Sequence, residues 1–165
     1  MVDVLCVGHA ACDITMAVSR HVGADEKMQA DAMQLAGGGP AANAAVTVVR
    51  LGGSSAFCGY LGRDVFGDAH MAEFEAEGVD THFIVRGPHP TPVSAILAKP
   101  DGTRAVVNYK GDTPWLEPKA VDPPKVRPKA ILLDGHEPLL SAPLVEWARA
   151  EDIPTVLDAG SVHRG

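Results

Sequence analysis

The sequence predicts an α/β fold in which a mainly parallel β-sheet is covered by helices on both faces. Short apolar segments of strand length alternate with longer segments of helical periodicity, most clearly after residue 129. This alternation is typical of parallel sheets. Residues 93–98 and 104–109 depart from it, because a tight turn at Asp101-Gly102 joins two strand-like segments directly. The hairpin predicts a second, smaller sheet.

Strand-like segments recur along the whole chain as apolar runs bounded by glycine, proline or polar clusters. Besides the hairpin, we expect strands at residues 2–8, 15–18, 28–35, 55–60, 81–85, 130–134 and 155–158. Five prolines between residues 114 and 128 predict an irregular connection before the strand at residues 130–134.

Three helices are expected between these strands. Residues 40–51 form the first, because Pro40 suits the first helical position and Gly52-Gly53 suits the C-terminal end. The second begins after Asp64 as its N-cap and stops at Gly78. The third spans residues 141 to about 150 and has one apolar side.

Composition restricts the class of protein. The chain has 165 residues, of which 46% are hydrophobic and 21% charged, as expected of one soluble globular domain. A net charge of −7 argues against nucleic acid or an anionic membrane as partner. The three cysteines form no CxxC pair, and the apolar N-terminus lacks a basic region before it, so we expect reduced thiols, no signal peptide and a cytoplasmic location.

The stretch Gly37-Gly38-Gly39-Pro40-Ala41-Ala42-Asn43 is the most informative motif. Glycines let a backbone approach a ligand closely, and the helix after Pro40 directs its free N–H groups toward them. Asn43 leans back toward the same space. The motif predicts a pocket for a hydroxyl-rich or anionic small molecule. The alternative is a glycine loop that only caps a helix.

Asp13 follows the first strand, at the sheet edge where ligands of α/β proteins bind. Its carboxylate could accept two hydrogen bonds from neighbouring hydroxyls, or it could cap a turn. Asp134 and Asp158 also end strands, and they could either face a cleft or cap loops. Lys27 and Asn108 lie at the ends of small-sheet strands. The seven histidines lack the spacing of a metal site.

A dinucleotide-binding motif is the main competing interpretation of the glycine stretch. Gly37-x-Gly39-x-x-Ala42 matches that fingerprint, but the fingerprint should directly follow the first strand. It should also have an acidic residue about 20 positions later, and the segment 57–61 contains none. We therefore disfavour a dinucleotide-binding dehydrogenase.

Residues 37–67 resemble the N-terminal signature of the PfkB/ribokinase family of carbohydrate kinases. The resemblance rests on Gly38-Gly39, Asn43, Arg50-Leu51-Gly52, Gly59 and the stretch from Leu61 to Gly67, and it extends to Asp13 and the Asp101-Gly102 hairpin. It implies a ribokinase-like Rossmann-type sheet with a small β-sheet lid, inserted at about residues 13–36 and 92–110. In this family the lid often mediates dimerisation, so the resemblance also implies a homodimer through the lid strands.

The resemblance further implies ATP-dependent phosphorylation of a sugar or sugar-acid hydroxyl, with ATP and Mg²⁺ as cofactors. Asp13, Gly38, Gly39 and Asn43 would bind sugar hydroxyls, and Lys27 and Asn108 of the lid would close over the substrate. Lys27, Asn108 and the triple glycine resemble the sulfofructose kinase branch in particular. The arginine that binds the sulfonate there has His136 as its counterpart here, which weakens that assignment.

The sequence departs from the family pattern in one major respect. The family's catalytic aspartate lies in a Gly-Ala-Gly-Asp motif, which is absent here, as is the Asn-x-x-Glu motif linked to magnesium. We therefore expect residues 1–165 to be the N-terminal, substrate-binding part of the domain, without its nucleotide-binding half and inactive alone. One alternative is a non-catalytic sugar-binding or regulatory module. Another is a kinase of the same superfamily that acts on a nucleoside or other small alcohol.

Overall fold

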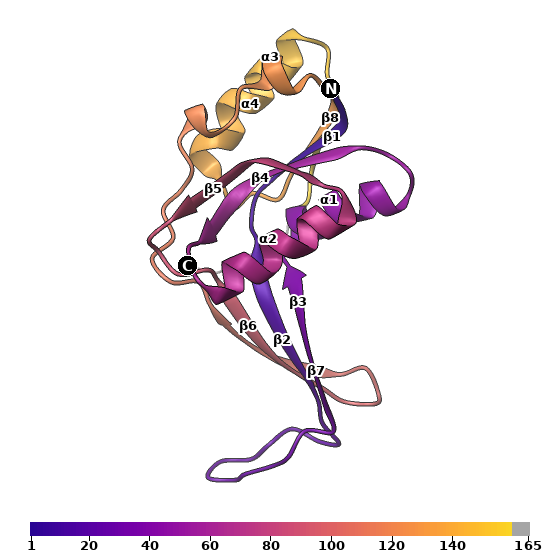
Figure 1. Cartoon of the computed structure of the whole chain (residues 1–165), viewed down its shortest axis with the longest axis vertical. Helices are drawn as coiled ribbons and strands as arrows, with labels where there is room; N and C mark the ends of the chain where they lie inside the picture. The colour runs from indigo at the N-terminus through magenta and orange to yellow at the C-terminus, as the bar shows by residue number, and fades with distance from the viewer. Residues whose placement is uncertain (160–165) are drawn as a thin grey trace.

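Two β-sheets meet end to end in the computed structural model, which describes residues 1–159 (Figure 1). The larger sheet has the order β5-β4-β1-β8-β9, and all its neighbours are parallel. Its strands are β1 (Val2–Val7), β4 (Ser55–Gly62), β5 (Asp80–Gly87), β8 (Pro128–Leu133) and β9 (Thr155–Leu157). The predicted α/β fold with a parallel central sheet is confirmed.

Helices cover both faces of this sheet, as the sequence predicts. On one face lie α1 (Pro40–Arg50) and α2 (Val65–Glu77), which pack on Cys6, Phe57 and Leu61. On the other lie η1 (Pro118–Ala120), α3 (Pro123–Val126) and α4 (Pro138–Ala150), over Leu5 and Val7 among others. Because successive strand residues point to opposite faces, β1 contributes to both cores.

The smaller sheet has the order β3-β2-β6-β7 and extends from one end of the larger one (Figure 1). Its strands are β2 (Ala11–Ala17), β3 (Ala32–Gly38), β6 (Val93–Ala98) and β7 (Arg104–Tyr109). The predicted hairpin is confirmed: β6 and β7 are antiparallel, and Gly102 has a φ of 82° in the turn between them. β2 runs parallel to β6 and antiparallel to β3.

The largest differences from the sequence-based expectation lie in β2, β3 and α4. β2 begins at Ala11 instead of residue 15, and β3 spans Ala32–Gly38 instead of residues 28–35. Glycine has low strand propensity, but cross-strand pairing with Ala11 and Cys12 carries Gly37 and Gly38 into the strand. α4 begins at Pro138 instead of residue 141, since proline is accepted in the first turn of a helix. Among the described helices, none is long and apolar enough to cross a membrane.

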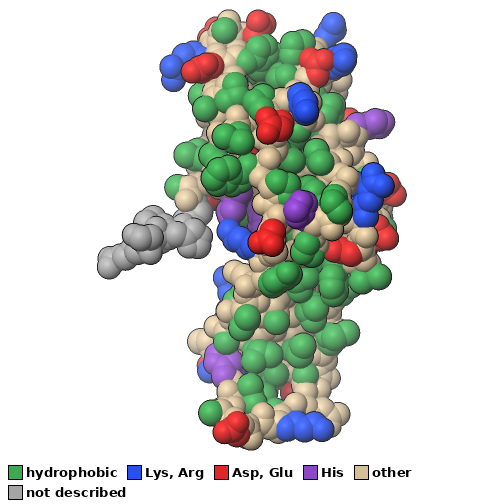
Figure 2. All heavy atoms as spheres, turned by 90° about the vertical axis from the view of Figure 1, so that its left-hand side faces the viewer, with side chains coloured by type: hydrophobic (Ala, Val, Ile, Leu, Met, Phe, Trp, Pro, Cys, Tyr) green, Lys and Arg blue, Asp and Glu red, His purple; other side chains and the backbone are tan. Residues whose placement is uncertain are grey.

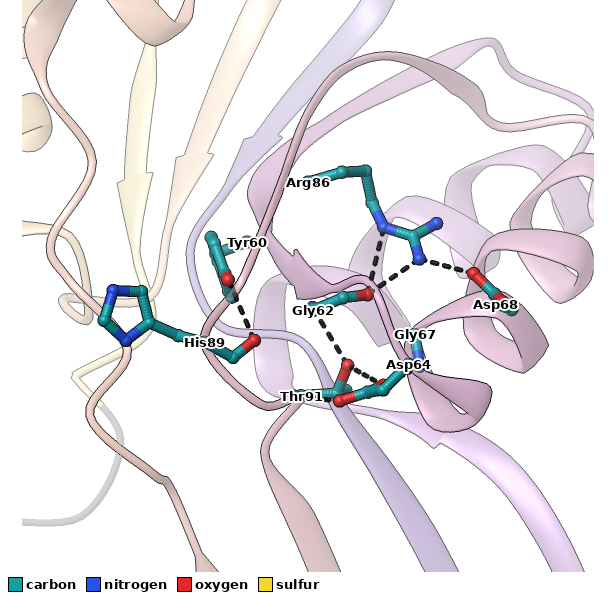
Figure 3. Close-up of polar contacts among 8 residues, drawn as sticks. All are labelled: Tyr60, Gly62, Asp64, Gly67, Asp68, Arg86, His89 and Thr91. Carbon is teal, nitrogen blue, oxygen red and sulfur yellow. Dashed lines mark hydrogen bonds and ion pairs between the residues drawn. The ribbon is translucent and has the colours of Figure 1, made fainter.

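Asp64 links the two sheets at the start of α2 (Figure 3). As predicted, it is the N-cap, and its carboxylate accepts a hydrogen bond from Gly67 N at 2.8 Å. The same carboxylate accepts bonds from Thr91 N and Thr91 Oγ1, both at 2.7 Å. Thr91 Oγ1 in turn accepts a bond from Gly62 N, at the end of β4. Since Thr91 precedes β6, this network holds the smaller sheet against the larger one.

We predict that Asp64→Ala lowers the free energy of unfolding by about 2–4 kcal/mol, because it removes a helix cap and leaves Thr91 without its acceptor. Urea unfolding measures the loss. Asp68→Ala is the matched control, because Asp68 makes an exposed ion pair with Arg86 that contributes about 1 kcal/mol or less. Equal losses for the two variants would contradict this role of Asp64.

Candidate functional site

A cavity of about 450 Å³ lies where the two sheets meet. It opens beyond the carboxyl ends of β1 and β8, whose connections run over opposite faces of the larger sheet. Ligands of open α/β sheets bind at this kind of switch point. The small sheet supplies one wall, and the turn after β1, the start of α1 and the turn after β8 supply the others.

The three consecutive glycines have three separate roles. A Cβ on Gly37 would lie 2.3 Å from His70 Nε2, so Gly37 allows α2 to pack closely. A Cβ on Gly38 would lie 2.3 Å from the Asp13 carboxylate, so Gly38 leaves room for that side chain. Gly39 has a φ of 108°, a conformation that favours glycine, and it N-caps α1. Gly38 and Gly39 therefore shape the floor of the cavity.

Asp134 is buried beneath this floor. Its Oδ2 accepts hydrogen bonds from His9 N at 2.8 Å and from Ala41 N at 3.2 Å, and its Oδ1 accepts one from His136 N at 3.0 Å. The carboxylate thus occupies the positive end of α1. The sequence predicts that this helix end faces the pocket. Of the two functions considered for this strand-end aspartate, the structure shows loop and helix capping.

Two stacked imidazoles border the cavity. The rings of His9 and His136 lie 4.9 Å apart at 23°, and His136 Nδ1 lies 3.2 Å from Asp134 Oδ1 without the alignment of a hydrogen bond. Burial, together with the nearby His136 and Lys110, lowers the pKa of His9 to about 4. Burial also raises the pKa of Glu137, which follows this turn, to about 7. Because its pKa is lowered to about 4, His9 is neutral near pH 7.

Several polar side chains face the cavity without an internal partner. Within residues 1–159, no hydrogen bond or ion pair engages the side chains of Asp13, Asn43, Asn108, Arg104 or Lys110. Polar groups that converge on a hollow without satisfying one another are available to a ligand. Asp13, Asn43 and Asn108 can bind hydroxyl groups. Arg104 and Lys110 can bind an anion.

The structure brings most of the predicted site residues together. Asp13, Gly39, Asn43, Asn108 and His136 line the cavity, and Gly38 lies directly beneath the Asp13 carboxylate.

Lys27 is the exception among these predicted residues. It lies in the connection between β2 and β3 and lines a separate hollow with Met16 and Leu97. The structure therefore does not place Lys27 at the cavity.

Arg104 and Lys110 are cavity residues that the sequence analysis did not identify. Both lie an even number of positions from Asn108, so alternation along β7 puts them on its side of the strand. This alternation is the feature of the sequence from which Arg104 and Lys110 could have been predicted as cavity residues.

The described residues 1–159 do not fit the metal that the resemblance implies. Among residues 1–159, no group of three or more His, Cys, Asp or Glu side chains could hold a metal ion. Of the carboxylates within residues 1–159, Asp13 alone lines the cavity. We assign neither ATP nor Mg²⁺ to these residues.

Comparison with known proteins gives a consistent result. The family model described as pfkB family carbohydrate kinase matches residues 1–144. The ATP-dependent ribose-1-phosphate kinase of Halopiger xanaduensis is 28% identical over 162 residues, which is 97% of this chain and 55% of that protein.

Solved structures show the same fold. The ribokinase of Arabidopsis thaliana, complexed with ribose and ATP, superimposes with a TM-score of 0.80 at 22% identity, over 98% of this chain and 54% of that one. The adenosine kinase of Sinorhizobium meliloti superimposes with a TM-score of 0.74 at 26% identity, over 94% of this chain and 56% of that one. The chain thus spans about half the length of these relatives.

We predict that Asp134→Asn lowers the free energy of unfolding by about 2–5 kcal/mol, because an amide cannot replace the charged acceptor of three backbone N–H groups. Chemical denaturation measures this loss. Asp31→Asn, an exposed residue before β3, is the control and is expected to change stability by less than about 0.5 kcal/mol. A fully stable Asp134→Asn variant would show that the buried carboxylate does not hold the cavity floor.

Proposed function

We propose, because this chain belongs to the pfkB family of carbohydrate kinases, that it forms the substrate-binding half of an enzyme that phosphorylates a sugar or sugar-acid hydroxyl at the expense of ATP. One observation carries the proposal. Asp13, Asn43 and Asn108 come from three different elements, have no side-chain partner within residues 1–159, and converge on one cavity beside Gly38 and Gly39. This is the arrangement that a polyol requires.

In this proposal the chain binds and orients the sugar. The Asp13 carboxylate accepts hydrogen bonds from two adjacent hydroxyls, and the absence of a side chain on Gly38 leaves room for it. Asn43 and Asn108 can each donate and accept, and they approach the sugar from α1 and β7. Fixed orientation of the reacting hydroxyl is a major part of catalysis in phosphoryl transfer.

We assign the remaining machinery to a C-terminal half of a ribokinase-like domain, outside residues 1–165. Support comes from the half-length coverage of relatives and from the absence of a Gly-Ala-Gly-Asp motif in this chain. That half would hold ATP with Mg²⁺, which supply the phosphoryl group. The β2–β3 and β6–β7 strands are the lid in this proposal. Three buried, unpaired cysteines favour the cytoplasm.

A nucleoside is the second substrate class to consider. The relative from Sinorhizobium meliloti is named an adenosine kinase, and Ile96 and Val106 give the cavity an apolar wall against which a base could stack. A panel of sugars and nucleosides in isothermal titration calorimetry distinguishes the two classes. A Gly-Ala-Gly-Asp motif encoded downstream of Gly165 supports the kinase, whereas a stop codon there supports a non-catalytic sugar-binding module.

We further propose that a second copy of this chain covers the outer face of the lid. Opposite the cavity, alternate lid residues are all apolar, and Figure 2 shows hydrophobic side chains gathered over the lower part of the molecule, where the small sheet lies. Val107 and Met33 on this face are 72% and 70% exposed. Large exposed apolar surfaces on a sheet mark contact sites, and self-complementary pairing is the commonest solution.

We expect the chain to sediment as a dimer in analytical ultracentrifugation and Val107→Lys to sediment as a monomer, since a buried unpaired charge disfavours the contact. Val65→Lys is the control, because Val65 is equally exposed but lies on α2. A wild-type monomer at all concentrations would contradict the dimer.

The sugar site is tested by Asp13→Asn. We predict that sugar affinity, measured by calorimetry, falls on the order of a hundredfold, because two charged hydrogen bonds are lost. Unfolding free energy should stay within about 0.5 kcal/mol of the wild type, since no hydrogen bond within residues 1–159 uses this carboxylate. Asp31→Asn serves again as the control. Unchanged affinity in Asp13→Asn would remove the assignment of this site.

A further inference from the structure

Four alternate residues run along the cavity side of β7 and just beyond it: Arg104, Val106, Asn108 and Lys110. They share a side because strand side chains alternate between faces. One edge of the cavity therefore presents a cation, an apolar residue, an amide and a second cation in order. This pattern is more than a neutral polyol requires.

The strand register places Arg104 away from the proposed hydroxyl-binding row. Asp13, Ser94 and Asn108 lie in one row across β2, β6 and β7, since Asp13 pairs with Ser94 and Ser94 with Asn108. Arg104 pairs with Ala98, four positions farther along β6, which is about 13 Å along the strand. Asp13 and Arg104 thus lie toward opposite ends of one cavity wall.

The side chains between these ends leave Arg104 free. Ala98 and, beyond it, Ala17 occupy the same row, so the residues paired with Arg104 have small side chains. Ile96 and Val106, which separate this row from Asp13, are uncharged. Within residues 1–159, Arg104 makes no ion pair, whereas Arg50 is paired with Glu77.

The cavity lining is positively charged, whereas the chain as a whole is negatively charged. The chain carries a net charge of −7, but the cavity lining contains Arg104 and Lys110 against the single carboxylate of Asp13. Lys110 lies close enough to His9 to contribute to lowering its pKa. A positive potential in a concave site concentrates anions.

From this arrangement we infer that the bound carbohydrate carries an anionic group, a phosphate or a carboxylate, and that Arg104 binds it while Asp13 binds hydroxyls at the other end. The inference rests on the proposed function, since it names the substrate class of the same cavity. A planar guanidinium matches both anions with two parallel hydrogen bonds, a geometry that lysine cannot provide. Lys110 adds to the attraction without a fixed geometry.

Matched pairs of ligands test the inference by isothermal titration calorimetry. D-Ribose is compared with ribose 5-phosphate and ribose 1-phosphate, and D-glucose with D-gluconate, so that phosphate and carboxylate are distinguished. In the wild type we expect at least one anionic ligand to bind about tenfold to a hundredfold more tightly than its neutral partner. The advantage should shrink as salt is raised.

Arg104→Gln should reduce this advantage to about threefold or less and leave the affinity for the neutral sugar within about twofold. The advantage in Arg104→Lys should lie between those of the wild type and Arg104→Gln, because lysine keeps the charge but loses the bidentate geometry. Arg149→Gln on α4, a cation outside the cavity, is the matched control and should behave as the wild type. Urea unfolding verifies that each variant is folded.

The possible failures are distinguishable. A wild type that binds neutral sugars as tightly as their anionic partners overturns the inference and leaves the proposed function intact. An anionic preference that persists in Arg104→Gln overturns the assignment of Arg104. A chain that binds no carbohydrate of either kind contradicts the proposed function itself, and the inference with it.

Discussion

The buried carboxylate of Asp134 is the interaction on which the site depends. It joins three segments distant in the sequence, because His9 N, Ala41 N and His136 N all donate to it. A Cβ on Gly8 would lie 1.9 Å from its Oδ1, so the glycine that ends the first strand is required for the same contact. The turn after β1, the start of α1 and the turn after β8 are therefore held around one charge, and the cavity forms above it.

The remaining walls follow from strand pairing. β2 leaves this anchored region with Asp13 facing the cavity, and its pairing with β6 and β7 aligns Ser94 and Asn108 beside that carboxylate. The Asp64–Thr91 network then fixes where β6 begins relative to the larger sheet. A rigid floor and a wall built from paired strands suit a site that must orient one hydroxyl among several.

Local patterns predicted much of this structure, and long-range contacts account for the rest. The α2 caps and the hairpin turn depend on neighbouring residues, so Asp64, Gly78 and Gly102 were correctly identified from the sequence. Asp13 and Asn43 were predicted from the first strand's end, the glycine stretch and the family resemblance, and both line the cavity. By contrast, the separate roles of the three glycines and the capping of α1 by Asp134 involve residues up to 93 positions apart, which no local pattern encodes. Lys27 was expected at a strand end, but it lies in the connection between β2 and β3 and lines a separate hollow.

In this proposal, one cavity binds an anionic carbohydrate at both ends: Asp13 binds its hydroxyls and Arg104 binds its anionic group. A crystal structure of the chain soaked with ribose 5-phosphate or D-gluconate tests it most directly. We expect electron density along the lid strands, with hydroxyls within hydrogen-bond distance of Asp13 and the anionic group on Arg104. A ligand bound away from this wall, or bound with its anionic group away from Arg104, would contradict it.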